Sequence, residues 1–395
     1  MYVKENVKQL NGEGAFAILS QVQQLEQQGH DVISFAIGDP DFDTPENITE
    51  AAINALTDGR THYCQSRGTP TLRKSVAEYV SKTRAIDIKP SEVVISPGAK
   101  PIIFFAALSC IEPGDEVLYP NPGFPAYQDC INLVGGSPVA LPLYEDNDFR
   151  LNVNDITNKL TKDSKMLIVN SPHNPCGSML TRQDVEAISE IVIKHNLWLI
   201  SDEIYSRLVY DQPHISFLSI PHMKERTILI DGFSKTYAMT GWRLGFGVMP
   251  EELAGAMELL IVNSVSCTPP FIQDAGVEAL IGSQNSTELM RQELMERRNL
   301  MVERINKLKG IHCLSPGGAF YIYVNVTDAC SELGIPNSKE FEQRLMHEAH
   351  VVVLARNAFG SRFPHEDSEY VRFSYVTDKE SINKGLDRIE NWLNQ

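Results

Sequence analysis

The sequence has no run of about 20 consecutive apolar residues, the length that a helix needs to span a membrane. It also lacks an excess of positive charge, because 35 lysines and arginines stand against 51 aspartates and glutamates, a formal net charge of −16. This charge argues against nucleic acid or an anionic membrane as the main partner, although local arginines can still bind an anionic ligand. The first ten residues contain no apolar core of a secretory signal, so we expect a cytoplasmic protein.

Paired cysteines and metal-binding motifs are also missing. The seven cysteines are widely scattered and form no Cys-x-x-Cys pair, a pattern typical of free thiols in a reducing compartment. There is no His-Glu-x-x-His motif, and the spacing of His347 and His350 does not fit a zinc protease. The sequence therefore predicts no metal site.

The chain does contain short apolar runs that are separated by segments of helix length. These runs are 93–95, 116–119, 166–169, 197–200, 227–230 and 246–248. Such runs are typical of parallel strands that are buried on both faces by helices. The sequence therefore predicts an α/β fold with a mostly parallel sheet.

The length and a change of pattern near residue 285 predict two domains. A chain of 395 residues exceeds the ~250–300 residues at which a single core stops growing. Beyond residue 285 a long charged helix is followed by strands and helices without a parallel ladder, which indicates a smaller α+β domain. We predict an N-terminal arm at 1–12, a small domain formed by 13–48 and 286–395, and a large domain at 49–285.

Lys235 lies in the most informative segment of the chain, 233–243. A lysine amine forms a Schiff base with a carbonyl group only when it is neutral, which requires a special environment. Ser234 precedes it, and Arg243 follows eight residues later; both side chains can bind a phosphate. This combination favours pyridoxal phosphate, an aldehyde cofactor with a phosphate group, although most lysines are simply solvated.

Other candidate residues follow the predicted strands, where open α/β sheets bind their ligands. Gly98, Ala99 and Lys100 follow the run 93–95, and their amides at the start of a helix could hold a phosphate. As a bare glycine turn, this segment is common.

Two further strand ends supply polar groups for a cofactor ring. Asn174 lies in an Asn-Pro turn after 166–169, and Asp202 and Tyr205 follow 197–200. An aspartate could keep a pyridine nitrogen protonated, and a tyrosine could donate to the ring oxygen. Each residue taken alone also fits a turn asparagine, a helix-capping aspartate or a core tyrosine.

In order and spacing these motifs resemble the class I/II pyridoxal-phosphate-dependent aminotransferases of fold-type I, the aspartate aminotransferase superfamily. The resemblance extends from Gly38-Asp39-Pro40 through Tyr63 and the segments described above to Arg372-Phe373-Ser374. It implies a large domain with a mostly parallel, seven-stranded sheet between helices. It also implies a homodimer with shared active sites that moves an amino group between an L-amino acid and a 2-oxo acid by a ping-pong mechanism.

The resemblance assigns a role to each matching residue. Lys235 would form the Schiff base and shuttle the proton, with Asp202 on the pyridine nitrogen and Tyr205 on the ring oxygen as further catalytic residues. The cofactor-binding residues would be Gly98, Ala99, Lys100, Phe124, Asn174, Asp202, Tyr205, Ser234, Lys235 and Arg243, with Tyr63 from the neighbouring subunit. The substrate-binding residues would be Gly38, Asn174, Arg372 and Phe16.

The choice of substrate is less clearly encoded. Lys100 matches a lysine that binds the distal carboxylate in some relatives specific for aspartate or glutamate. Glu13 would repel an acidic side chain, and Phe16 favours an apolar or aromatic pocket, although it also fits a core position. We therefore lean towards a neutral or aromatic amino acid, with an acidic substrate as the alternative.

Two other activities stay open at this stage. One is a carbon–sulfur β-lyase on the same scaffold. The other is a non-catalytic effector-binding protein, which the joint presence of Lys235 and Asp202 disfavours. Many relatives have glycine at the position of Arg356. This arginine could bind a second acidic group, but we expect it to lie on the surface.

Overall fold

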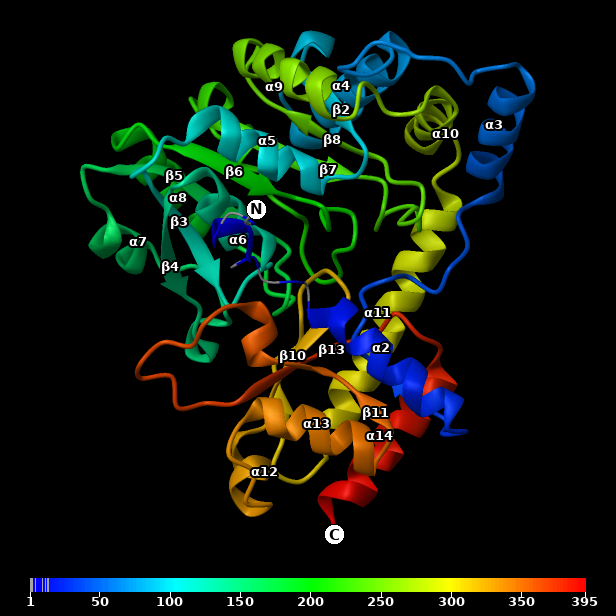
Figure 1. Ribbon diagram of the computed structural model, residues 1–395, viewed down its shortest axis with the longest axis vertical. Coiled ribbons are helices and arrows are strands. Elements are labelled where there is room, and N and C mark those ends of the chain that lie inside the picture. Colours follow the sequence, from blue (N-terminus) through cyan, green and yellow to red (C-terminus); the bar gives the residue numbers. More distant parts are fainter. Residues whose placement is uncertain (1–2, 4, 9, 11, 13) are drawn as a thin grey trace.

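The computed structural model describes residues 3, 5–8, 10, 12 and 14–395, and gives only the backbone of residues 5, 6 and 15–17. Glu13 and residues 1–2, 4, 9 and 11 of the predicted arm therefore lie outside the described part of the chain. Figure 1 shows the chain folded into two bodies, with the large sheet in the upper one and the C-terminal helices in the lower one.

A seven-stranded sheet forms the upper body, with strand order β2-β8-β7-β6-β5-β3-β4. The strands are β2 (Val93–Ser96), β8 (Gly245–Val248), β7 (Thr227–Gly232), β6 (Trp198–Asp202), β5 (Ser164–Asn170), β3 (Glu116–Asn121) and β4 (Ser137–Pro142). The strands from β7 to β4 are parallel, whereas β8 runs antiparallel to both neighbours. The prediction of a mostly parallel sheet between helices is confirmed.

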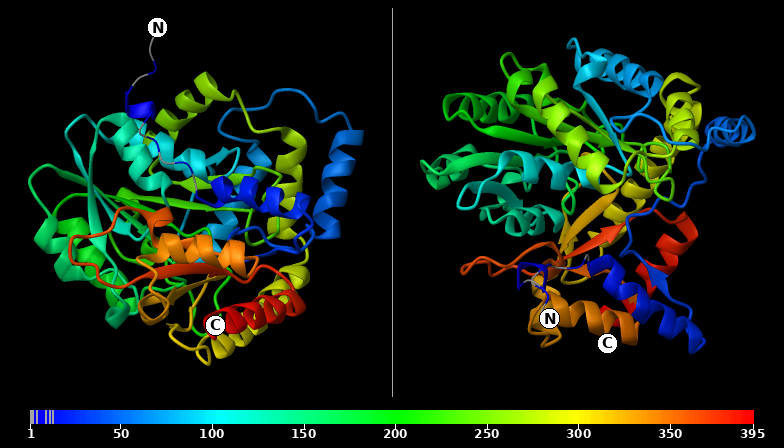
Figure 2. Two further views of the ribbon diagram at one scale, coloured as in Figure 1. Left: turned by 60° about the horizontal axis from the view of Figure 1, so that its bottom comes forward. Right: turned by 45° about the horizontal axis from the view of Figure 1, so that its top comes forward.

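Helices cover this sheet on both faces (Figure 2). Successive side chains along each strand point to opposite sides of the sheet, so each strand packs against helices on both sides. On β7, Ile228 and Ile230 pack with α5 (Lys100–Cys110) and α9 (Glu251–Ser264). Leu229, between them, belongs to the cluster on the other face. Buried packing on both faces explains why these strands are continuous apolar runs in the sequence.

The remaining helices of the upper body are α3 (Glu46–Thr57), α4 (Pro70–Arg84), α6 (Ala126–Val134), α7 (Val153–Lys159), α8 (Arg182–Lys194) and α10 (Pro270–Ile281). Local sequence signals fix several of their starts. Thr69 caps α4 by accepting a hydrogen bond from the Leu72 amide, with Pro70 in the first turn. Thr181 and Asp184 form a capping box at the start of α8.

The lower body contains an antiparallel sheet of order β12-β13-β10-β9. Its strands are β12 (Leu354–Ala355), β13 (Tyr370–Ser374), β10 (Tyr321–Asn325) and β9 (His312–Cys313). Its helices are α11 (Asn285–Ile305), α12 (Thr327–Glu332), α13 (Ser338–Glu348) and α14 (Lys379–Leu393). Figure 1 shows the long helix α11 running from the upper body into the lower one.

Most of the N-terminal segment joins this lower body, but α1 (Glu5–Lys8) lies against α6 of the upper body. The segment also contains α2 (Gly14–Gln27) and β1 (Ile33–Ser34), and β1 pairs in parallel with β11 (Val351–Val352). Segments from both ends of the chain thus lie side by side, as a discontinuous small domain requires. The boundaries at 48/49 and 285/286 stay predictions.

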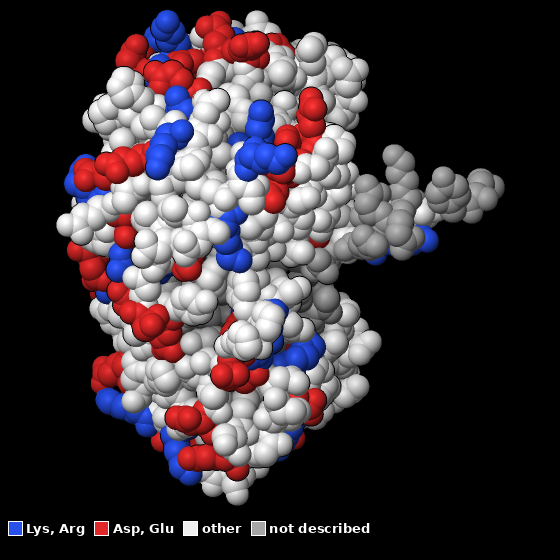
Figure 3. All heavy atoms as spheres, turned by 90° about the vertical axis from the view of Figure 1, so that its left-hand side faces the viewer, with Lys and Arg blue, Asp and Glu red and all other residues white. Residues whose placement is uncertain are grey.

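The exterior carries mixed charge. On the face shown in Figure 3, acidic and basic side chains are interspersed, and no basic patch dominates this view. Within the described residues, no helix combines the length and the apolar character needed to cross a membrane.

Candidate active site

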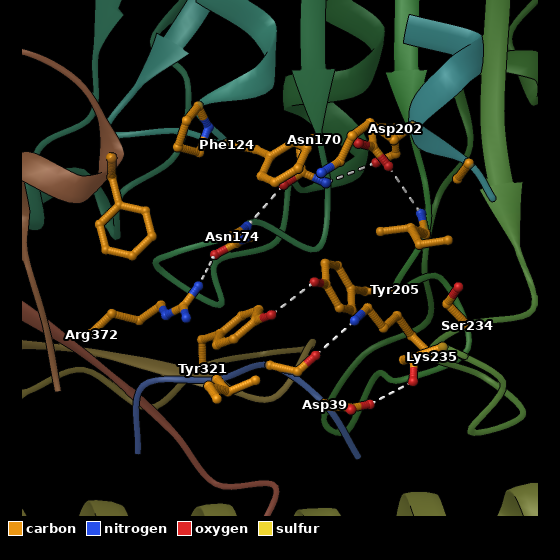
Figure 4. Close-up of a pocket in the computed structure, with 18 of the residues that line it drawn as sticks. Asp39, Phe124, Asn170, Asn174, Asp202, Tyr205, Ser234, Lys235, Tyr321 and Arg372 are labelled. Atoms are coloured by element: carbon orange, nitrogen blue, oxygen red, sulfur yellow. Dashed lines mark hydrogen bonds between the residues drawn. The ribbon is translucent and has the colours of Figure 1, made fainter. Parts of the chain in front are cut away.

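A cavity of about 540 Å³ lies where the carboxyl ends of the parallel strands face the lower body. Most of the predicted site residues line it: Gly38, Ala99, Lys100, Phe124, Asn174, Asp202, Tyr205, Ser234, Lys235, Arg243 and Arg372. They come from segments more than 300 residues apart in the chain, and Figure 4 shows several of them converging. The structure therefore brings together, in one cavity, most of the residues that the sequence predicted for the site.

Two predicted residues, Gly98 and Tyr63, do not line the cavity. Gly98 lies one residue before Ala99, at the start of α5. Tyr63 is 88% exposed on the loop between α3 and α4. The side chain of Phe16 lies outside the described part, so its expected contact with the substrate stays a prediction.

Lys235 is half-buried on the loop that follows β7. Its Nζ donates a hydrogen bond of 2.7 Å to the carbonyl oxygen of Gly38 and lies 5.6 Å from the centre of the Phe320 ring. A Cβ atom on Gly38 would lie 2.0 Å from the Tyr321 hydroxyl, so only glycine lets this carbonyl approach. The amine thus points into the cavity, held by a backbone group from the N-terminal segment (Figure 4).

Asp202 ends strand β6, in register with Asn170 on β5 and Ile230 on β7. Its Oδ2 accepts a 2.7 Å hydrogen bond from the Tyr127 hydroxyl, and its Oδ1 accepts one of 3.3 Å from the Ile204 amide. Burial raises the pKa of Asp202 to about 6, although these two hydrogen bonds lower it. The group is therefore a buried acid with a high proton affinity, suited to pairing with a cationic ring nitrogen.

Tyr205 and Asn174 place polar groups along the same wall. The Tyr205 and Tyr321 hydroxyls lie 3.1 Å apart, and burial raises the pKa of Tyr205 well above its usual value. Tyr205 therefore keeps its proton and can donate it in a hydrogen bond. The backbone N–H of Asn174 donates a 2.9 Å hydrogen bond to Asn170 Oδ1, which fixes the conformation of the turn.

The start of α5, Ser234 and Arg243 form a cradle for an anion. Gly98 has φ +93°, and a Cβ atom there would lie 2.4 Å from Arg243 Nη2. A Cβ atom on Gly245 would lie 2.3 Å from the Ala99 amide nitrogen. Glycines thus let a guanidinium and a helix N-terminus approach closely, an arrangement that binds phosphate.

The residues present fit pyridoxal phosphate. The donor set of amides, hydroxyl and guanidinium suits its phosphate, the acid at Asp202 suits its ring nitrogen, and the Lys235 amine suits its aldehyde. Phe124, on the cavity wall, supplies an aromatic face.

Arg372 on β13 closes the opposite side of the cavity. Its Nη1 donates to Asn174 Oδ1 at 2.9 Å, and its Nη2 donates to the carbonyl oxygen of Ala36. Its guanidinium lies 4.2 Å from the ring centre of Tyr321 and 4.9 Å from that of Phe359. A guanidinium that is fixed in this way can bind a carboxylate in a defined orientation.

Sequence reasoning missed several side chains of the site. Asn170 is the last residue of β5, so the strand-end rule that found Asp202 could have found it too. Tyr127 and Tyr321 contact site residues across the fold, and no local signal marked them. The pairing of Asp39 with Thr240, at 2.7 Å, was equally unmarked.

The expectation of a surface position for Arg356 is wrong. The residue is 1% exposed and forms a bidentate ion pair with Glu366. Its Nε donates to Oε1 at 2.5 Å, and its Nη2 donates to Oε2 at 3.0 Å. It also donates to Asn121 Oδ1 at 3.0 Å. Burial is possible because Glu366 neutralises the charge and Asn121 completes the hydrogen bonding.

A buried ionic network supports the wall behind Asp202. Arg84 at the end of α4 pairs with Glu203 at 3.0 Å and with Asp231 at 2.9 Å, and His214 lies 3.0 Å from Glu203. Burial opposes the charge on Glu203, but His214 and Arg84 lower its pKa to about 2. The network fixes Glu203, the residue next to Asp202, and Asp231, near the end of the strand that leads to Lys235.

Comparisons with known proteins agree with this geometry. The sequence model of the family described as "Aminotransferase class I and II" matches residues 30–389. The aspartate aminotransferase of Pyrococcus abyssi is 41% identical over 369 residues, which cover 92% of each chain. The aromatic-amino-acid aminotransferase 2 of Thermococcus litoralis is 40% identical over 375 residues, or 94% of each chain.

Solved structures agree as well. The crystal structure of the aspartate aminotransferase from Rhizobium meliloti superposes with a TM-score of 0.94 at 30% identity, covering 100% of this chain and 99% of that one. The family match spans most of the sequence, and the residues of the cavity fit pyridoxal phosphate in their chemistry. The chain therefore belongs to the class I and II aminotransferases, transferases that use pyridoxal phosphate.

Proposed function

We propose that this aminotransferase moves the amino group of a neutral or aromatic L-amino acid to a 2-oxo acid by a ping-pong mechanism. The observation that carries the proposal is the joint presence in one cavity of the Lys235 amine, the buried acid Asp202 and the fixed guanidinium of Arg372. An amine, an acid and a carboxylate-binding group are what transfer from an amino acid requires.

Each residue has one task in this proposal. When bound, pyridoxal phosphate supplies an aldehyde that accepts the amino group and a ring that withdraws electrons from the substrate α-carbon. Asp202 holds a proton on the ring nitrogen, and Tyr205 donates to the ring oxygen. Nζ of Lys235 takes the proton from the substrate α-carbon and delivers it to the carbon that belonged to the aldehyde group.

Two groups of residues fix the reactants. The amides of Gly98, Ala99 and Lys100, with Ser234 and Arg243, bind the phosphate. Arg372 and Asn174, already hydrogen-bonded to each other at 2.9 Å, orient the substrate carboxylate so that the α-carbon faces Lys235.

The preference for a neutral or aromatic side chain is supported by the apolar part of the cavity wall. Its members are Leu19, Ile37, Ile103, Phe124, Leu354 and Phe359. Such a wall binds an apolar side chain by removing it from water and gives an acidic one no hydrogen-bond partner. The 40% identical relative from Thermococcus litoralis is named for aromatic amino acids.

One observation favours an acidic substrate as the second candidate. Lys100 also lines the cavity, with its Nζ 5.2 Å from the centre of the Phe124 ring. A cation in this position can bind a distal carboxylate, and the relatives named aspartate aminotransferase are equally similar to the chain.

A donor screen with a Lys100→Met variant separates the two candidates. We expect the wild type to have its highest kcat/KM with aromatic or neutral donors. The ratio of kcat/KM for aspartate to that for phenylalanine should change less than about 3-fold in the variant. If Lys100 bound a distal carboxylate, the ratio should fall about 30-fold or more, because removing one partner of a buried charge pair costs about 2–5 kcal/mol. Lys100→Arg, which keeps the charge, is the matched control.

We further propose a homodimer in which Tyr63 reaches the phosphate site of the other subunit. Tyr63 is 88% exposed, which is unusual for a tyrosine without a partner surface. The loop of Tyr63 contacts α9 through Arg67, whose Nε donates to Glu258 Oε2 at 2.9 Å. On α9, Leu259 and Val262 are 65% and 49% exposed. An exposed apolar helix face of this kind marks an interaction surface.

Hybrid dimers test this arrangement. Lys235→Ala and Tyr63→Ala chains, each impaired alone, are coexpressed with different tags. A mixed dimer would contain one site with an intact Lys235 and an intact Tyr63 from its partner, so the mixture should regain up to about a quarter of wild-type activity. Activity that merely averages the two parent enzymes would show that Tyr63 acts within its own subunit.

The cysteines support a cytoplasmic location, which we also propose. All seven are free of disulfides in the structure, as expected in a reducing compartment.

A further inference from the structure

We infer that Arg356 is a positioning residue for the substrate carboxylate, because its buried guanidinium joins the two loops that carry aromatic walls of the cavity. Arg356 begins the short helix η5 (Arg356–Phe359) in the lower body, directly after β12. It reaches Asn121, the last residue of β3 in the upper body. The role in carboxylate binding rests on the proposed function, whereas the joining of the loops does not.

The guanidinium contacts both bodies of the molecule at once. Its Nη2 donates to Asn121 Oδ1 at 3.0 Å, and its Nη1 donates to the carbonyl oxygen of Gly360 at 3.0 Å. The same Asn121 side chain donates from Nδ2 to the carbonyl oxygen of Ser361 at 2.7 Å. The end of β3 is therefore joined to the segment after η5 by both atoms of one amide, and Arg356 completes this junction.

A close backbone approach makes the junction tight. Gly360 has φ +117°, a conformation that favours glycine. A Cβ atom on Gly360 would lie 2.6 Å from Asn121 Oδ1, the atom that accepts the hydrogen bond from Arg356. The chain can therefore pass against Asn121 only because this residue is a glycine.

The junction continues into the walls of the cavity. The backbone N–H of Gly123 donates a 2.9 Å hydrogen bond to the carbonyl oxygen of Phe359. Gly123 directly precedes Phe124, and both phenylalanines line the cavity. The ring centre of Phe359 lies 4.9 Å from the guanidinium of Arg372. A shift of the junction would therefore move the ring beside Arg372 relative to the ring of Phe124.

The chemistry of the side chain explains why the junction depends on arginine. The Arg356 side chain is 1% exposed, and Glu366 neutralises it through hydrogen bonds to Nε and Nη2. A lysine would keep the charge but lacks the planar fork that reaches Glu366, Gly360 and Asn121 together. A methionine would remove the charge and leave Glu366, whose side chain is 16% exposed, in contact with water. These two substitutions separate the loss of geometry from the loss of charge.

Substrate binding should depend on this junction. Two rings flank the Arg372 guanidinium, that of Tyr321 at 4.2 Å and that of Phe359 at 4.9 Å. Donors and 2-oxo acids share the carboxylate that Arg372 is proposed to bind, so a displaced ring should weaken the binding of both. A misplacement of about 1 Å can cost about 100-fold. We expect the effect in KM more than in kcat, because Lys235 and Asp202 are held by other contacts.

The first test compares carboxylate binding by the cofactor-loaded wild type, Arg356→Met and Arg356→Lys. Calorimetry measures the Kd of hydrocinnamate and succinate, two carboxylates without an amino group that represent the two candidate substrate classes. Arg356→Met should raise the Kd of the carboxylate that binds the wild type about 10-fold or more, with an intermediate value for Arg356→Lys. In transamination assays kcat should change less than about 3-fold.

Arg304→Met is the control for these variants. It removes a guanidinium that joins α11 to α14 through Asn383 and Asp387, outside the residues that line the cavity. Loss of this contact should leave the Kd of the carboxylate at the wild-type value. The control therefore separates a specific effect on the cavity from a general loss of stability.

Hydrogen exchange tests the junction without reference to activity. The Gly123 amide is hydrogen-bonded across the two bodies, so the peptide 121–127 should exchange about 10-fold faster in Arg356→Met and at the wild-type rate in Arg304→Met. If Arg356→Met fails to fold, the double variant Arg356→Met/Glu366→Gln replaces it, because it also removes the carboxylate left without a partner.

The inference is overturned if folded Arg356→Met keeps the wild-type Kd, if exchange of the peptide 121–127 is unchanged, or if Arg304→Met shows the same losses. Faster exchange in a protein that binds neither carboxylate would support the junction and contradict the proposed role of Arg372. Failure of this inference and failure of the proposed function are therefore read from different measurements.

Discussion

Lys235→Ala should lower kcat/KM for amino transfer by more than about 10⁴-fold, leaving no measurable turnover. The same Nζ that lies 2.7 Å from the Gly38 carbonyl oxygen is the group proposed to bind the aldehyde and to carry the proton. No other lysine amine of the cavity wall can replace it, because Lys100 lies at the start of α5, on the side of the phosphate cradle.

The cofactor should nevertheless bind to this variant. The phosphate cradle and Asp202 are unchanged, so pyridoxal phosphate should be retained without a covalent bond. Borohydride reduction followed by mass spectrometry should fix the cofactor to the wild type and not to the variant. Lys162→Ala, at an exposed position, is the control and should behave as the wild type. Near-normal transamination by Lys235→Ala would contradict the assignment of this lysine.

Asp202→Asn should lower kcat by about 10³-fold or more while keeping the shape of the site. An amide is not ionised and cannot balance a protonated ring nitrogen, so the ring would no longer draw electrons from the α-carbon. The Tyr127 hydroxyl, 2.7 Å from Asp202 Oδ2, would still have an oxygen or nitrogen to contact, which limits structural damage. Single-turnover rates measured at saturating substrate separate this effect from weaker binding; an unchanged rate would remove Asp202 from the mechanism.

The raised pKa of Asp202 also predicts how the free energy of unfolding of the cofactor-free protein depends on pH. Burial raises the pKa of Asp202 to about 6 from the ordinary value of 3.8, so the folded state binds this proton more tightly than the unfolded state. The stabilisation is therefore complete below about pH 3.8 and is lost as the pH rises through 6. The free energy of unfolding of the wild type, minus that of Asp202→Asn, should fall by about 3 kcal/mol across this range. Denaturant titrations at several pH values would measure it, and a flat difference would contradict the raised pKa.

The sequence predicted those parts of the site that follow from local rules. Asp202, Asn174 and Lys235 lie on the segments that follow buried apolar runs. Parallel strands bring their carboxyl ends to one edge of the sheet, so the meeting of these residues could be inferred before the fold was known. The strand β4 escaped this reasoning because its two prolines and half-buried pattern differ from a continuous apolar run.

Contacts made across the fold were not predictable in this way. Tyr321 reaches Tyr205 from the sheet of the lower body, and Gly38 must be a glycine because of Tyr321. Arg356 is buried because Glu366, ten residues later, folds back to neutralise it. Such pairings depend on the path by which a loop comes back into contact with other parts of the fold. Neither hydrophobic periodicity nor turn residues encode that path.

A half-reaction with cofactor-loaded enzyme tests the proposed amino transfer most directly. The enzyme is mixed with a panel of L-amino acids and no 2-oxo acid, and the absorbance of the cofactor is followed together with the products. The proposed mechanism predicts a single conversion that yields about one equivalent of 2-oxo acid per subunit and is reversed by adding a 2-oxo acid. Continuous release of ammonia without an acceptor, as in a β-lyase, or no spectral change with any donor, would contradict it.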